Sequence, residues 1–115
     1  MTLTVPFYLI LLHYIADFIL QRDADAQAKW KAFSEGEWYH LLFHTFTYSL
    51  CFLWLGWEFF LITFLTHTIT DFFTAPLNHW LWYEKKSPHW FFVGVGGDQV
   101  IHYLTLGLTY KYLIG

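Results

Sequence analysis

Histidine and aspartate side chains occur in this sequence as four pairs with i,i+4 spacing, each within a stretch that is otherwise apolar. Residues four apart lie on the same face of a helix, so each pair places two side chains next to each other. Imidazole nitrogens and carboxylate oxygens are donors that divalent transition metals bind in proteins. The eight residues are His13, Asp17, His40, His44, His67, Asp71, Asp98 and His102. We predict that all eight are metal ligands around one interior volume.

The three aspartates of these pairs need a compensating charge. A charged side chain inside a membrane segment costs at least ~2.5 kcal/mol, and no lysine or arginine within the apolar stretches is placed to offset it. The sequence therefore predicts one or two bound divalent ions, zinc first, with iron or manganese as alternatives. Asp71 and Asp98 are the candidate catalytic residues, one to bridge metals and the other to accept a proton from water. Interhelical hydrogen bonds or a proton relay are the alternative use of the same pairs.

The composition limits the class of protein. Of the 115 residues, 57% are hydrophobic and only 13% are charged, against roughly 25% charged in ordinary soluble domains. The length allows one domain, residues 1–115. A net charge of −3 excludes a nucleic-acid binder, because no basic patch is present to neutralise phosphates. Cys51 is the single cysteine, which excludes a disulfide framework. We therefore expect a small integral membrane protein.

Four apolar stretches must position the paired residues. They cover residues 2–20, 38–57, 59–82 and 90–114, and each approaches the ~20 residues that a membrane-spanning helix needs. Short connections predict an all-α integral membrane four-helix bundle with up-down-up-down topology. We expect Pro76 to end or kink the third helix, and residues 21–36 to form an interfacial helix or a plain connector. The sequence is also compatible with a homo-oligomer.

The distribution of basic residues predicts the orientation in the membrane. Five lysines and arginines lie in the first and third connections, and only Lys111 lies on the other side. By the positive-inside rule the five-charge side is cytoplasmic, so both termini face outward from a bacterial cytoplasmic membrane. No basic residue precedes the first apolar stretch, so we expect a retained helix rather than a cleaved signal peptide.

The first and third stretches share a short repeat. The segment His13-Tyr-Ile-Ala-Asp17-Phe matches His67-Thr-Ile-Thr-Asp71-Phe as HxIxDF, which suggests that a two-helix unit occurs twice, as in other membrane folds with parallel repeats. Three glycines at positions 94, 96 and 97 precede Asp98. They predict either a close approach between helices or a break that starts a new helix with an anion at its N-terminus.

Several of these segments resemble one family. The segment HYIADFILQ at residues 13–21, the Ala28-Lys29 that follows, the His67/Asp71 pair and the Asp98-Gln99 pair with His102 are similar to the bacterial and phage membrane family grouped as domain of unknown function 3307. The resemblance implies no established activity. A looser similarity to small histidine-rich membrane proteins labelled metal-dependent hydrolases suggests a reaction class.

Three functions are compatible with these features. The first is a membrane metallohydrolase acting on a lipid or lipid-linked ester or phosphate at the cytoplasmic leaflet. The second is a di-iron oxidase or hydroxylase, although of the histidine boxes typical of desaturases only His40/His44 is present. The third is a non-enzymatic metal or proton conduit, or a protein whose metal holds the bundle together.

Overall fold

The computed structural model describes residues 6–115, and this part of the chain is helical with no strand. The predicted all-α fold class is therefore confirmed. Thr2 and the start of the first predicted stretch lie outside the described residues. The elements in chain order are α1 (Phe7–Tyr14), the π-helix η1 (Ile15–Ile19), α2 (Asp23–Ala28), α3 (Lys31–Glu35), α4 (Tyr39–Leu50), the 3₁₀ turn η2 (Leu53–Leu55), α5 (Trp57–Tyr83) and α6 (Pro88–Leu113).

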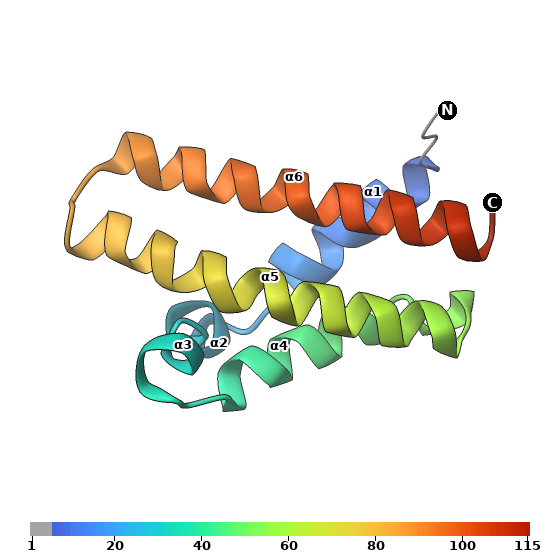
Figure 1. Cartoon of the computed structure of the whole chain (residues 1–115), viewed down its shortest axis with the longest axis horizontal. Coiled ribbons are helices and arrows are strands. Elements are labelled where there is room, and N and C mark those ends of the chain that lie inside the picture. Colours follow the sequence, from blue (N-terminus) through green and yellow to red (C-terminus); the bar gives the residue numbers. More distant parts are fainter. Residues whose placement is uncertain (1–5) are drawn as a thin grey trace.

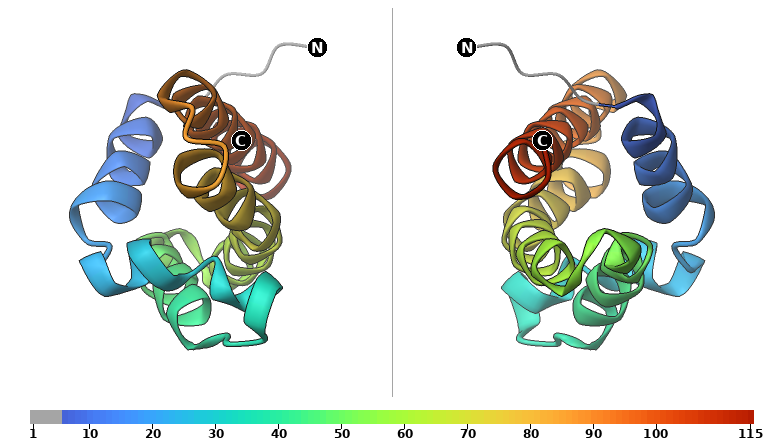
Figure 2. Two further views of the ribbon diagram at one scale, coloured as in Figure 1. Left: turned by 90° about the vertical axis from the view of Figure 1, so that its left-hand side faces the viewer. Right: turned by 90° about the vertical axis from the view of Figure 1, so that its right-hand side faces the viewer.

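The long helices α5 and α6 form an antiparallel hairpin against which the other elements pack (Figure 1). The α5–α6 turn lies at the left end of the view, together with α2 and α3, and the α4–α5 connection lies at the right end with the C-terminus. Seen along the long axis, α1 and η1 lie opposite the hairpin, and α4 with the α2–α3 segment (residues 23–35) lies between them (Figure 2).

Local sequence signals set the bounds of these helices. Ser87 caps α6 by accepting a hydrogen bond from the backbone N–H of Trp90, and Pro88 occupies the first turn, where its missing N–H costs nothing. Gly36, with φ of 70°, follows α3 in the left-handed conformation that glycine adopts without strain. The sequence predicts that Pro76 ends or kinks the third helix. The first alternative is wrong, because α5 continues through Pro76 to Tyr83. Only the one hydrogen bond that its missing N–H would donate is lost.

The glycines before Asp98 do not interrupt α6, which is continuous from Pro88 to Leu113. At Gly94 a Cβ atom would lie 2.2 Å from the side-chain oxygen of Asn78 on α5. Glycine there permits the close approach of the two helices, so the expectation of a helix break with a new N-terminus is wrong.

The described helices differ in length from the four predicted spans. Among them α5 alone combines the length and the hydropathy of a membrane-crossing helix. Helix α4 has 12 residues, which rise only about 18 Å against a hydrocarbon thickness of about 30 Å. Helix α1 and η1 contribute 8 and 5 residues. The fold is thus an all-helical bundle in which two of the four expected helices are short.

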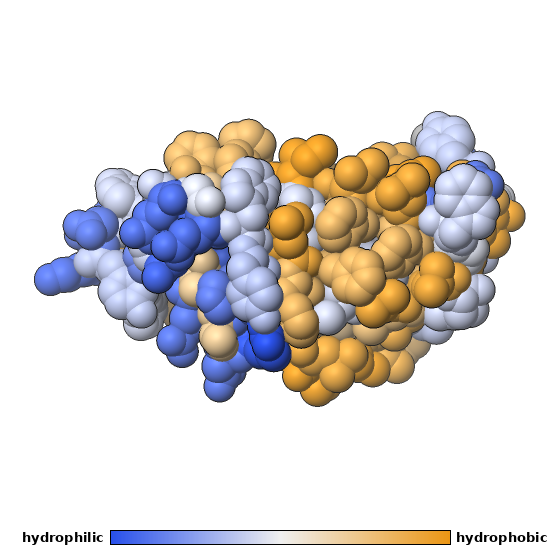
Figure 3. Space-filling view, turned by 90° about the horizontal axis from the view of Figure 1, so that it is seen from below, coloured by the Kyte–Doolittle hydropathy of each residue, from blue (hydrophilic) through white to orange (hydrophobic). Residues whose placement is uncertain are grey.

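The interior of the bundle is more polar than its surface. In residues 6–115, twelve buried side chains are polar or charged and ten are apolar. Large apolar side chains are instead exposed along the helices, for example Ile69 at 60% and Phe73 at 57% on α5. Figure 3 shows a continuous apolar zone over the body of the molecule, with hydrophilic side chains gathered at the end that holds α2 and α3.

Asp25 holds the α2–α3 segment to the bundle. Its carboxylate is fully buried and accepts hydrogen bonds from Arg22 Nε and Nη2 at 2.8 and 3.0 Å. His40 Nδ1 of α4 lies 2.8 Å from Asp25 Oδ1. Burial by itself would raise the pKa of Asp25, but the hydrogen bonds from Arg22 and His40 outweigh it and lower the pKa. The ionised carboxylate therefore ties α2 to α4.

We expect the Asp25→Asn substitution to lower the free energy of unfolding by about 1–3 kcal/mol, the usual value of hydrogen bonds to a charged group. Asp23→Asn is the matched control, since Asp23 is exposed on the same helix. Thermal unfolding in detergent and hydrogen exchange of residues 23–35 measure the effect. Because the folded pKa is lowered, the stabilisation is complete above the unfolded pKa and disappears as the pH falls through the folded one. Equal Tm values for the two variants would contradict this role.

Candidate metal centre

Four donor atoms converge at the centre of the bundle. They are His44 Nε2 from α4, His67 Nε2 and Asp71 Oδ2 from α5, and Asp17 Oδ1 from η1. Five of the six distances among them are 2.9 Å (His44–Asp17), 3.2 Å (His44–His67), 3.2 Å (His67–Asp71), 3.5 Å (His44–Asp71) and 3.5 Å (His67–Asp17). A tetrahedral zinc ion with bonds of about 2.0–2.1 Å separates its ligands by about 3.3–3.4 Å. The cluster thus has the dimensions of a tetrahedral site.

A second group of possible ligands adjoins the first and shares Asp17 with it. It consists of Asp17, Asp98 and His102, whose donor atoms all lie within 4.8 Å of one another. His102 Nε2 lies 3.3 Å from Asp98 Oδ1 and 3.1 Å from Asp71 Oδ1. Asp71 therefore directs one oxygen toward the first group and the other toward His102. These buried groups can hold a metal ion, with Asp71 and Asp17 between two positions.

The HxIxDF repeat is accompanied by matching contacts. In the first half of the chain Asp17 Oδ1 lies 2.9 Å from His44 Nε2, and in the second half Asp71 Oδ1 lies 3.1 Å from His102 Nε2. Each aspartate is therefore paired with a histidine on a later helix, Asp17 with His44 on α4 and Asp71 with His102 on α6. The two halves differ in that His67 faces the centre, whereas its counterpart His13 does not.

Backbone and ring packing orient the central side chains. Asp17 lies in the π-helix η1, in which the N–H of Leu20 donates to the carbonyl of Ile15 at 2.9 Å; such wide turns are frequent at functional sites. The ring of His67 lies between those of Tyr48 and His102, with centroids 3.9 Å away on each side. The Nδ1 atoms of His44 and His67 have no hydrogen-bond partner in the described part. Ring packing, rather than a hydrogen bond to Nδ1, directs the Nε2 of His67 inward.

His13 lies beside the cluster rather than in it. Gln99 Nε2 donates to Asp17 and to Asp98, so its carbonyl oxygen faces His13 Nε2 at 2.6 Å. Nε2 of His13 must then carry the proton, and Nδ1 accepts from the hydroxyl of Tyr48 at 2.5 Å. Both ring nitrogens are occupied by protein partners. In the structure His13 therefore positions Gln99 and is not among the convergent donors of residues 6–115.

His40 lies away from the cluster as well. Its Nδ1 contacts Asp25 in the α2–α3 clamp, and it belongs to neither group of convergent donors in residues 6–115. One helix turn separates the rings of His40 and His44 along α4. The ring of His40 contacts Asp25 of the neighbouring α2. The structure thus brings together six of the eight predicted residues, namely Asp17, His44, His67, Asp71, Asp98 and His102.

The cluster also contacts a cation, Lys29, whose part in it no spacing in the sequence predicts. Lys29 extends from the α2–α3 segment and donates from Nζ to Asp71 Oδ2 at 3.1 Å, with its side chain only 17% exposed. Burial by itself would lower the pKa of Lys29, but the negative charges of Asp71, Asp17 and Asp98 outweigh it and raise the pKa. Three carboxylates and one ammonium leave two negative charges if the histidines are neutral. One divalent ion would balance them.

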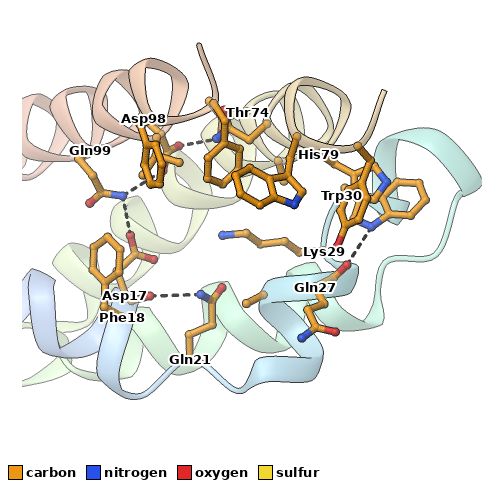
Figure 4. A pocket seen from close by; sticks show the side chains of 18 residues that line it. Asp17, Phe18, Gln21, Gln27, Lys29, Trp30, Thr74, His79, Asp98 and Gln99 are labelled. Carbon is orange, nitrogen blue, oxygen red and sulfur yellow. Dashed lines mark hydrogen bonds between the residues drawn. The ribbon is translucent and has the colours of Figure 1, made fainter. Parts of the chain in front are cut away.

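A cavity of about 390 Å³ opens from this centre between the α5–α6 hairpin and α2. Figure 4 shows Asp17, Asp98 and Gln99 at one end, with Lys29 extending between the two aspartates. Thr74 Oγ1 donates to Asp98 Oδ1 at 2.6 Å and fixes that carboxylate at the edge of the cavity. At the other end the stacked rings of Trp30 and His79 line the wall, with centroids 3.9 Å apart. The candidate metal centre is thus accessible to a ligand of moderate size.

Comparison with known protein families gives a match over nearly the whole chain. The family model described as "Protein of unknown function (DUF3307)" matches residues 5–114. No curated protein and no solved structure matches the chain.

We expect zinc to bind the purified protein and raise its Tm, because an ion at about 100 times its Kd adds about 2.7 kcal/mol to the free energy of unfolding. His67→Asn removes one donor of the tetrahedral group and should weaken zinc binding by more than about tenfold, since even changes around a metal ligand cost that much. His40→Asn is the matched control and should bind zinc like the parent. Elemental analysis and thermal unfolding with and without zinc measure both. Equal losses of zinc binding in the two variants would contradict this and indicate that His40 is also a ligand.

Proposed function

The chain belongs to the DUF3307 family of proteins of unknown function, and we propose that it is a membrane-embedded, metal-dependent hydrolase of an amphiphilic ester or phosphate. One observation carries this proposal: Asp17 belongs to both groups of buried metal-binding donors and also lines the 390 Å³ cavity. A bound ion would therefore face a space that a substrate can enter. A metal that only held the helices together would need no such opening.

The distribution of apolar side chains supports placement in a membrane. Contiguous exposed apolar surface marks a membrane or protein interface, and the most apolar stretch of α5 is only 22% buried. The long axis of the molecule is 42 Å, close to the roughly 40–45 Å of a bilayer with its headgroups. The end that holds α2, α3 and Lys85 would face the cytoplasm of a bacterium. The short α1 and α4 would then enter the bilayer alongside the α5–α6 hairpin.

The charge balance favours one divalent ion, held by Asp17, His44, His67 and Asp71. Two imidazoles and two carboxylates in a tetrahedral arrangement suit zinc. An ion held by these residues would supply a coordinated water with a pKa of about 7 and a Lewis acid for the oxygen of a carbonyl or phosphoryl group. A second ion near Asp98 and His102 would make the centre dinuclear.

The two candidate catalytic aspartates differ in their surroundings, which divides their roles. Both oxygens of Asp71 face cluster partners, Oδ1 toward His102 and Oδ2 toward His67 and Lys29. Asp98 instead lines the cavity and is 8% exposed. Asp71 therefore serves as a metal ligand, and Asp98 as the general base that accepts a proton from the attacking water.

The reaction proposed for these groups is hydrolysis. The oxygen of water forms a bond to the carbonyl carbon or the phosphorus, and the bond from that atom to the oxygen of the leaving alcohol breaks. Asp98 takes one proton from the water and returns it to the alcohol, so the carboxylate is regenerated. Thr74 and Gln99 hold Asp98 in place through their hydrogen bonds to its two oxygens.

A pair of isosteric variants tests this division of roles. Asp98→Asn should lower kcat by about 10²–10⁴-fold, the usual contribution of a general base, and keep the zinc content of the parent. Asp71→Asn should lose zinc and activity together. Turnover is measured on a panel of lipid esters and lipid phosphates, with zinc-loaded protein in lipid nanodiscs and Asp23→Asn as the control. No turnover of the panel by the parent would overturn the hydrolase proposal, and oxygen-dependent oxidation by an iron-loaded protein would replace it.

The orientation is tested by cysteine labelling in intact cells. After Cys51→Ala, Lys31→Cys and Lys85→Cys should resist a membrane-impermeant maleimide, whereas Lys111→Cys should react. Lys31 is used because Lys29 is largely buried at the cluster. The reverse pattern would place the metal centre near the outer leaflet.

A further inference from the structure

The cavity beside the candidate metal centre changes in character from one end to the other. Asp17, Lys29, Asp98 and Gln99 form its polar end, next to the metal-binding donors (Figure 4). The part of the lining that the α5–α6 hairpin supplies toward its turn includes the large apolar side chains of Trp82, Phe91, Phe92 and Val95, together with the polar Asn78 and His79. A ligand that fills this space needs a polar head and an apolar body.

The apolar wall continues onto the outer surface of the protein. Trp82 is 44% exposed and Phe92 is 65% exposed. The rings of Trp82 and Phe91 contact each other across the hairpin, with centroids 4.9 Å apart. This wall therefore reaches the protein surface near the α5–α6 turn, where a hydrocarbon chain can lie against the exposed rings instead of being enclosed in the protein.

At the polar end, the unused hydrogen-bonding capacity indicates the kind of head. An ammonium has three N–H donors, and Lys29 uses one of them on Asp71. Gln21 donates from Nε2 to the backbone carbonyl of Asp17, and its Oε1 is buried without a partner in the described part. Figure 4 shows the side chain of Gln21 extending into the cavity. The vacant partners are thus a cation and a neutral acceptor, which suit an anion that also carries an O–H group.

A phosphate monoester suits the cation in either ionisation state, and its singly ionised form, which predominates below its second pKa of about 6, also keeps one P–OH donor for the oxygen of Gln21. A phosphate diester or a carboxylate ester has no such donor. Without a metal ion the cluster carries an excess of negative charge and repels an anion. With one divalent ion the excess is balanced, and Lys29 and the ion attract the head from two sides.

We propose that the cavity binds the phosphate monoester of a long-chain alcohol, with the phosphate between Lys29 and the metal position and the chain along Trp82, Phe91 and Phe92. This inference rests on the proposed function and names its substrate class. Hydrolysis would join the oxygen of water to phosphorus and break the bond from phosphorus to the alkyl oxygen. The products are the free alcohol and inorganic phosphate.

Photolabelling tests the binding step without relying on turnover. Zinc-loaded protein in nanodiscs of phosphatidylcholine is irradiated with an alkyl phosphate that carries a diazirine in its chain, and the labelled peptides are identified by mass spectrometry. We expect label on residues 79–95 that excess dodecyl phosphate displaces and that removal of zinc abolishes. Lys29→Met should reduce this label by about 10- to 100-fold, as expected for loss of a charge-assisted hydrogen bond. Lys29→Arg should retain it, and Lys31→Met is the matched control from the same segment.

Competitors distinguish the sources of the phosphate group. Dodecyl phosphate should displace the label at a concentration at least about tenfold lower than inorganic phosphate, since each buried methylene adds to affinity. Equal competition by inorganic phosphate, or competition by dodecyl maltoside, would overturn the assignment of a phosphate amphiphile. Label spread evenly over the apolar surface, or unchanged in a Lys29→Met variant that still holds zinc, would overturn it as well.

The outcome separates this inference from the proposed function. Specific label with no turnover of any lipid ester or phosphate leaves a lipid-phosphate binding site and removes the hydrolase. Turnover of uncharged esters without specific label keeps the hydrolase and removes the phosphate monoester.

Discussion

The structure depends on the burial of two adjacent carboxylates, those of Asp17 and Asp71. Both lie within helices that are otherwise mostly apolar. Unpaired ionised carboxylates in such surroundings cost several kcal/mol each, so every neighbouring group must supply a hydrogen bond or a positive charge. His44 and His102 lie within hydrogen-bond distance of one aspartate each, and Lys29 and Gln99 add a cation and an amide donor. The helices are arranged around these contacts, and an apolar cluster that includes Leu9, Phe52, Phe59 and Leu106 packs beside them.

Several irregular features serve that arrangement. The π-helix at Ile15–Ile19 lies where Asp17 joins the cluster, and a wide turn of this kind changes the direction of the side chains that follow it. At Gly94 of α6 the backbone lies beside the side chain of Asn78 on α5, where a Cβ atom would force that side chain to move. The packing of His67 against the stacked ring of His102 and the tilted ring of Tyr48 replaces the second hydrogen bond that commonly fixes a metal-binding histidine. The π-helix and the ring packing thus orient donor atoms of the cluster.

The α2–α3 segment links the exposed end of the molecule to its centre. Asp25 fastens this segment to α4 through His40, and four residues later Lys29 reaches Asp71. Trp30, the next residue, stacks on His79 and forms part of the cavity wall. One short polar segment thus supplies both the cation of the centre and a side of the space through which a substrate would reach it. Movement of this segment would change the charge of the centre and the width of the cavity together.

The sequence by itself determined the helical class and the faces on which the histidines and aspartates lie, because i,i+4 spacing fixes which side chains share a side of a helix whatever surrounds it. It therefore grouped Asp17, His44, His67, Asp71, Asp98 and His102 correctly as neighbours on inward faces. Tertiary structure decided which atoms meet. Spacing along one helix does not set the rotation of that helix or its depth against the next helix. The sequence therefore could not show that His40 contacts Asp25, or that His13 contacts Gln99 and Tyr48. Nor could it show that Lys29 reaches Asp71, 42 positions further along the chain, because a long flexible side chain on a polar connection has no periodicity that reveals its partner. The sequence also did not predict the lengths of α1 and α4. Hydropathy marks where a chain is apolar, but not where packing replaces the α-helix with a π-turn or a 3₁₀ turn.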